Sequence, residues 1–193
     1  MKIVLYTGYQ ETPWNSTSLA KTGLGGTEQC VLYLSRHLAS YPGNQVWVVG
    51  DVIEGDCDGI KYRKTQTFKN EVDSVDTIIA ASYIHYLKEF EDFDYKNSIF
   101  WVHNTDYFNW WKGSEIKDHR KLLNHPKLSH IVCLTYWHQE KFTEQFPEAL
   151  GKTIVIGNGI ERDNFIDVWS KPKTHLGRSF PGEDHIKNDN QYI

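Results

Sequence analysis

The amino-acid sequence predicts a single α/β domain, built as a Rossmann-like, doubly wound and mainly parallel sheet with helices on both faces. Two observations support this prediction. Apolar runs of strand length alternate along the chain with segments whose apolar residues recur at helical spacing. Several of the strand-length runs are continuously hydrophobic, which is typical of strands that helices cover on both faces. The 193 residues suffice for one such core.

The elements follow in order from the amino terminus. We expect a first strand over residues 2–7, then a long loop, then a helix over residues 27–40 that Thr27 caps. Further strands are expected at residues 45–50, 60–65, 75–81, 98–103, 130–135 and 153–156, with helices around residues 85–90, 115–124 and 136–146. Residues 1–165 therefore form the expected domain. Residues 166–193 carry scattered prolines, glycines and charges and form a polar tail, either disordered or draped over the domain.

Composition excludes several classes of protein. The net charge of −4 argues against a general nucleic-acid binder, because binding phosphates needs a basic face. No apolar stretch approaches the ~20 residues that span a bilayer, and the first residues lack the features of a signal peptide. The three cysteines show no metal-ligand spacing, so we expect no metal site. Cys30 and Cys133 lie in apolar runs as expected buried free thiols, which fits a cytoplasmic protein.

A glycine-rich loop, Gly23-Leu24-Gly25-Gly26-Thr27-Glu28, opens the first long helix. Glycine lets a backbone approach a ligand closely, and the unpaired amides of a helix start favour an anion such as a diphosphate. The loop departs from the dinucleotide pattern because Glu28 stands in the place of the third glycine, and about 18 residues separate the first strand from the helix. Asp51 mimics the ribose-binding acid of that pattern, so an NAD-binding or other small-molecule enzyme stays an alternative. A plain flexible loop is the simplest alternative.

Three further segments follow strands, at the edge where open α/β sheets bind ligands. His103, Asn104 and Asp106 can hydrogen-bond to sugar hydroxyls or phosphate, although a purely structural histidine explains His103 as well. Thr135 is expected to cap the following helix. The segment Gly157-Asn158-Gly159 permits a sharp turn, and a simple turn is its alternative explanation.

Aromatic residues make up 14% of the chain, and several of them adjoin one strand end. A run beside polar residues is what a sugar-stacking surface or a partner interface looks like. This expected acceptor or partner surface consists of Tyr107, Phe108, Trp110 and Trp111.

Taken in order, these segments resemble the amino-terminal domain of the retaining GT-B glycosyltransferases of family four, the glycogen-synthase-like and mannosyltransferase-like group. The family's glycine-glycine-x-glutamate loop is matched by Gly25-Gly26-Thr27-Glu28, and its histidine after a central strand by His103. A Ser/Thr-led helix is matched from Thr135 to Phe142. The closing segment is matched by Ile156-Gly157-Asn158-Gly159-Ile160-Glu161-Arg162-Asp163-Asn164-Phe165, in which Gly157 replaces the usual proline and Glu161 the usual aspartate.

The resemblance implies transfer of a sugar, of the hexosyltransferase type, from a nucleotide-diphosphate sugar to an acceptor, with retention and without a metal or other cofactor. It implies that Gly25 and Gly26 approach the diphosphate or the acceptor, with Thr27 and Glu28 beside them, and that His103 contacts the donor sugar. Asn158 and Gly159 would lie near the cleft between domains. Family members continue into a second Rossmann-like domain that holds most of the nucleotide sugar.

This chain ends 28 residues after Phe165, so the resemblance covers only the acceptor side. We expect such a chain to be inactive alone unless a second chain supplies the donor-binding domain. A non-catalytic module that binds a glycan or a protein is the alternative from another class.

Overall fold

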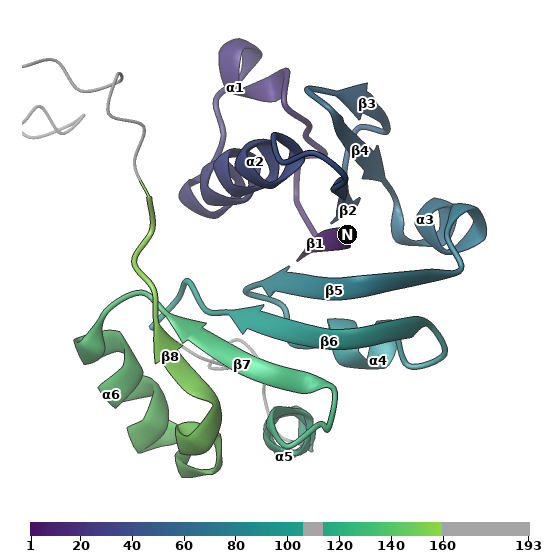
Figure 1. Cartoon of the computed structure of the whole chain (residues 1–193). Coiled ribbons are helices and arrows are strands. Elements are labelled where there is room, and N and C mark those ends of the chain that lie inside the picture. Colours follow the sequence, from purple (N-terminus) through teal and green to yellow (C-terminus); the bar gives the residue numbers. More distant parts are fainter. Residues whose placement is uncertain (106–113, 160–193) are drawn as a thin grey trace, which may run out of the picture. The chain divides into compact units, whose positions relative to one another are not determined.

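The computed structural model describes residues 1–105 and 114–159. Its centre is a sheet whose strands lie side by side in the order β3-β4-β2-β1-β5-β6-β7-β8 (Figure 1). All neighbouring pairs are parallel except β3 and β4. The strands are β1 (Lys2–Gly8), β2 (Gln45–Gly50), β3 (Gly55–Cys57), β4 (Ile60–Arg63), β5 (Ser74–Ala81), β6 (Asp94–Trp101), β7 (Leu128–Cys133) and β8 (Thr153–Val155).

Helices cover both faces of this sheet. They are α1 (Ser18–Lys21), α2 (Gly26–Ala39), α3 (Thr65–Glu71), α4 (Tyr86–Glu89), α5 (Ser114–Leu123) and α6 (Tyr136–Gln145), with a 3₁₀ helix at Pro147–Lys152. One core cluster joins Val4 and Ile78 of the strands to Phe68 of α3 and Phe142 of α6. The other joins the strands to Val31 and Leu32 of α2, which lies on the opposite side of the sheet from α4 and α5 (Figure 1). The predicted Rossmann-like α/β class is confirmed.

The chain winds outward from β1 in both directions. β1 pairs with β2 on one side and with β5 on the other. The chain adds strands on the β2 side first and then on the β5 side, so its direction across the sheet reverses between β1 and β5. An open α/β sheet offers its ligand crevice at such a switch point, outside the carboxyl ends of the strands. A ligand of this fold is therefore expected at the loops that follow β1, β5, β6 and β7.

Several local expectations are corrected by the structure. Helix α2 begins at Gly26 with Gly25 as its N-cap, so Thr27 is not the cap. The antiparallel edge strand β3 and the helices α1 and α3 were not predicted; all three are short, and periodicity over so few residues is weak. β6 starts at Asp94, four residues before the expected strand. Cys133 is buried, whereas Cys30 is only partly buried.

Candidate functional site at the carboxyl edge of the sheet

The end of β1 is closely packed against the residues that follow β5. Gly8 has φ of +61°, and a Cβ added there would lie 2.5 Å from Cγ of Tyr83. The Tyr83 hydroxyl donates to the carbonyl oxygen of Tyr9 at 2.8 Å. Only glycine combines this backbone conformation with so close a ring, and the contact fixes the first residues of the loop at the switch point.

The end of β2 is tied to the same place. The Asp51 amide donates to the Gly8 carbonyl at 3.0 Å, and its Oδ2 accepts from the Gln10 amide at 3.1 Å. Asp51 is thus engaged with the backbone of the loop after β1. This role differs from that of an acid which binds a ribose, and it weakens the NAD-binding alternative.

The long loop between β1 and α2 is held in place, in contrast to the flexible loop considered above. Trp14 is 2% exposed and forms an isolated parallel bridge with Val52. Asn15 accepts from the amide and hydroxyl of Thr17, while its own amide donates to Ser18 Oγ at 3.1 Å. The Trp14–Val52 bridge fixes the loop to the residues that follow β2, and the Asn15 contacts join the loop to the start of α1, which precedes the glycine segment.

The start of α2 combines an open backbone with a carboxylate. No atom lies within 4 Å of a Cβ added at Gly26. At Gly25, an added Cβ would lie 2.3 Å from Oε2 of Glu28, so the Glu28 side chain folds back toward the N-cap. A carboxylate is stabilised there by the partial positive charge of the helix start. Thr27 is partly buried on the same turn.

His103 follows β6 on a partly buried site. Its ring lies 4.4 Å, centroid to centroid, from the ring of Trp101, and its Nε2 finds no hydrogen-bond partner among the described residues. Burial is the main cause that lowers the pKa of His103, to about 4, and the nearby His138 contributes to the same shift. The imidazole is therefore neutral at physiological pH, and it can donate or accept one hydrogen bond at Nε2.

This pKa predicts how stability depends on pH. The unfolded His103 gains a proton near its ordinary value of 6.5 and the folded one only near 4, so stability falls as pH drops through this window. At ~1.4 kcal/mol per pKa unit, the loss is about 3 kcal/mol at most. The free energy of unfolding, measured with urea at pH 7 and at pH 4.5, should fall less between these two pH values in His103→Gln than in the unsubstituted chain. An equal loss in both proteins would contradict the assignment.

Thr135 and His138 organise the turn between β7 and α6. Thr135 is the N-cap of α6, and its Oγ1 accepts from the His138 amide at 3.0 Å, as the sequence predicted. The His138 ring, 3% exposed, accepts at Nδ1 from the Leu134 amide at 3.0 Å. Its Nε2 lies 3.1 Å from the carbonyl oxygen of Asn104. The structure thus brings Asn104 and Thr135 together through His138, which our sequence reasoning had not singled out.

The residues after β8 lie beside this turn. A Cβ added at Gly157 would lie 3.7 Å from the Leu134 carbonyl oxygen, and Asn158 and Gly159 are exposed. The predicted site residues thus form two groups: Gly25 to Glu28 at the start of α2, and His103, Asn104, Thr135, Asn158 and Gly159 after β6, β7 and β8. The remaining predicted site residues, Asp106, Tyr107, Phe108, Trp110 and Trp111, lie outside the described residues.

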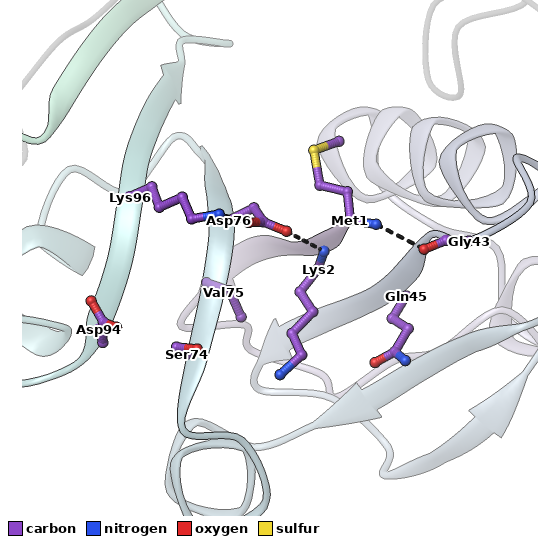
Figure 2. A pocket seen from close by; sticks show the side chains of 9 residues that line it. All are labelled: Met1, Lys2, Gly43, Gln45, Ser74, Val75, Asp76, Asp94 and Lys96. Carbon is purple, nitrogen blue, oxygen red and sulfur yellow. Dashed lines mark hydrogen bonds and ion pairs between the residues drawn. The ribbon is translucent and has the colours of Figure 1, made fainter.

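A cavity of about 320 Å³ opens at the opposite edge, at the amino ends of β1, β2, β5 and β6 (Figure 2). One pair of charges in its lining is joined by an ion pair. Asp76 accepts from the Lys2 amide at 2.8 Å and forms an ion pair with Lys96, whose hydrogen bond lowers the pKa of the Asp76 carboxyl. These contacts join the amino ends of β1, β5 and β6.

In the described ranges, 1–105 and 114–159, no three His, Cys, Asp or Glu side chains gather as a metal site would require. Within the same part of the chain, none of the helices has the length and apolar character needed to cross a membrane.

Two solved structures share the fold of this chain. HepE of Anabaena in complex with UDP matches 83% of this chain with a TM-score of 0.53 at 14% sequence identity, and HepE in complex with UDP-glucose matches 82% with a TM-score of 0.52 at 13% identity. The match covers 45% and 44% of the HepE chain, so the matched part of this chain spans less than half the length of that protein. No protein-family model and no curated protein matches the sequence. In its described part, this chain has the Rossmann-like α/β fold of one half of HepE.

Proposed function

We propose that this chain is the acceptor-side half of a glycosyltransferase of the GT-B type, family-four-like, which transfers a sugar from a nucleotide-diphosphate donor. The observation that carries the proposal is the open backbone of Gly26 at the start of α2. It lies at the carboxyl edge of a fold that resembles HepE, which was crystallised with UDP and with UDP-glucose. A helix start suits a diphosphate, and the backbone at Gly26 is open to one although the Glu28 carboxylate lies at Gly25.

The proposed chemistry follows from the charge that develops during transfer. The leaving diphosphate gains negative charge as the glycosidic bond breaks, and preorganised amides stabilise such charge. Gly25 and Gly26 would supply these amides, on a loop that Trp14 and Asn15 hold in place. The neutral His103 would lie beside the donor sugar, and its Nε2 is buried without a hydrogen-bond partner among the described residues.

Exposed aromatic side chains on the same edge support a carbohydrate acceptor. Tyr9 after β1 is 70% exposed, and Tyr136 and Trp137 on the first turn of α6 are 80% and 57% exposed. Aromatic rings stack on the apolar faces of sugars while their polar tips stay in water. They are a second candidate for acceptor binding beside the aromatic residues that the sequence predicts at 107–111, and the donor-binding half would come from a further domain or a second chain.

Titration calorimetry tests this proposal on the 193-residue chain with UDP-glucose, UDP and NAD. We expect UDP-glucose and UDP to bind weakly, through the diphosphate and the sugar alone, and NAD to bind no better than UDP. His103→Ala should weaken UDP-glucose about tenfold, that is by ~1.4 kcal/mol, with little change for UDP, because His103 contacts the sugar. His130→Ala, at an exposed position on β7, is the matched control and should change neither the affinity for UDP-glucose nor the affinity for UDP.

The other outcomes separate the alternatives. Binding of a glycan without any nucleotide would favour the non-catalytic module. Tight binding of NAD would favour a dinucleotide enzyme. Sugar transfer by the chain alone would contradict the claim that it forms only half of an active site.

A further inference from the structure

We propose that His138 is the positioning residue of this edge: as a neutral ring protonated at Nε2, it holds the loop after β6 against the turn between β7 and α6. Through Asn104 it sets the place of the adjacent His103. This inference rests on the proposed function as far as ligand binding is concerned, but its geometric part stands independently.

The hydrogen bonds determine the tautomer. The Leu134 amide is a donor and points at Nδ1 at 3.0 Å, so Nδ1 must carry a lone pair and no proton. A neutral imidazole then carries its proton on Nε2, which donates to the Asn104 carbonyl at 3.1 Å. Doubly protonated imidazole would set one N–H against another. Burial disfavours that charged form as well and lowers the pKa of His138.

The ring joins segments that are distant in sequence. Leu134 lies four residues before His138, whereas Asn104 lies 34 residues before it. The backbone of His138 is itself held, because its amide donates to the Thr135 cap. The ring can thus transmit the fixed position of α6 to the Asn104–Thr105 peptide.

Because His103 adjoins Asn104, the His138–Asn104 contact can affect the binding of a ligand at His103. His103 is bonded directly to Asn104 in the chain, and the Asn104 carbonyl lies 3.1 Å from Nε2 of the His138 ring. A buried hydrogen bond that holds a loop spares a ligand the cost of ordering that loop. His138 touches no proposed substrate atom, so its effect on binding is exerted through His103 and Asn104.

Two substitutions separate the two ring contacts. The amide nitrogen of glutamine reaches about as far as Nε2, so His138→Gln keeps the donor toward Asn104 and loses the acceptor for Leu134. The carboxamide oxygen of asparagine matches Nδ1, so His138→Asn keeps the acceptor and loses the tie to Asn104. Both variants replace the ring by a neutral amide, and they differ in which contact remains.

Two measurements that need no ligand decide the geometric claim. Long-range ¹H–¹⁵N spectra of the unsubstituted chain at pH 7 should show His138 protonated at Nε2 alone. Amide exchange at Asn104 and Thr105 should be about tenfold faster in His138→Asn than in His138→Gln, which should resemble the unsubstituted chain. Protonation at Nδ1, or equal exchange in both variants, would overturn the proposal.

Binding of UDP-glucose tests the functional part. We expect His138→Asn to weaken it about tenfold, and His138→Gln to restore most of the affinity. If the unsubstituted chain binds no nucleotide sugar, the proposed function fails, and the exchange rates still decide whether His138 positions the loop. If UDP-glucose binds and both variants weaken it equally, His138 is only structural and the inference is wrong.

Discussion

Replacing Gly8 by alanine is expected to lower the free energy of unfolding by about 2–5 kcal/mol. The backbone at Gly8 has φ of +61°, which costs a non-glycine residue ~1–2 kcal/mol. The new methyl group would also lie 2.5 Å from the Tyr83 ring, and forcing such a contact costs typically 1–3 kcal/mol. For a chain of this size the melting temperature should fall by roughly 5–15 °C, as measured by calorimetry.

Gly43→Ala is the matched control for this prediction. Gly43 also has positive φ, +84°, but nothing lies within 4 Å of an added Cβ. It should therefore show the backbone cost without the steric one. Equal losses in the two variants would mean that the Tyr83 ring moves aside freely, and that the packing at the switch point is not rigid. Combining Gly8→Ala with Tyr83→Ala should recover the steric part if the contact is its cause.

Replacing Gly26 by tryptophan is expected to abolish the binding of diphosphate-containing ligands and to leave the fold intact. The side chain would extend from the first residue of α2 into open space and cover the amides that we assign to the diphosphate. Glycine is a poor helix residue, so the substitution itself should not destabilise α2. UDP affinity by calorimetry should fall more than a hundredfold, a loss of ~2.7 kcal/mol or more.

Gly151→Trp serves as the control, because Gly151 is equally open and lies in the 3₁₀ helix. It should bind UDP like the unsubstituted chain. Unchanged UDP affinity in Gly26→Trp, with an unchanged melting temperature, would remove the start of α2 from the site. Gly26→Ala should fall between the two, because a methyl group covers little of the helix start.

The strands of the fold were largely predictable, since burial on both faces imposes long apolar runs. β1, β2, β5 and β7 were found from such runs to within a few residues. β3 was missed because Gly55–Cys57 has no apolar pattern and is held only by its pairing with β4. The order of the loop after β1 was also missed. It depends on Trp14 meeting Val52, a contact between residues 38 positions apart that no local pattern reveals.

Local features of the candidate site, such as a helix cap, could be predicted from the sequence, but contacts between distant segments could not. Thr135 was identified because a Thr after an apolar strand marks a helix start, a signal that needs no tertiary contact. His138 was missed because Asn104, the partner that gives it a role, is remote in sequence. Glu28 at the third residue of α2 fits the pattern of a side chain that reaches back to its N-cap, and that local signal could have indicated its place over Gly25.

The position of Glu28 has a consequence for affinity. Its carboxylate is a tethered anion at the helix start, and tethering on a short link corresponds to an effective concentration of the order of millimolar. The diphosphate that we propose at this helix start would have to displace this carboxylate. Binding is then a displacement, so the net gain is the difference between two anions on one helix start.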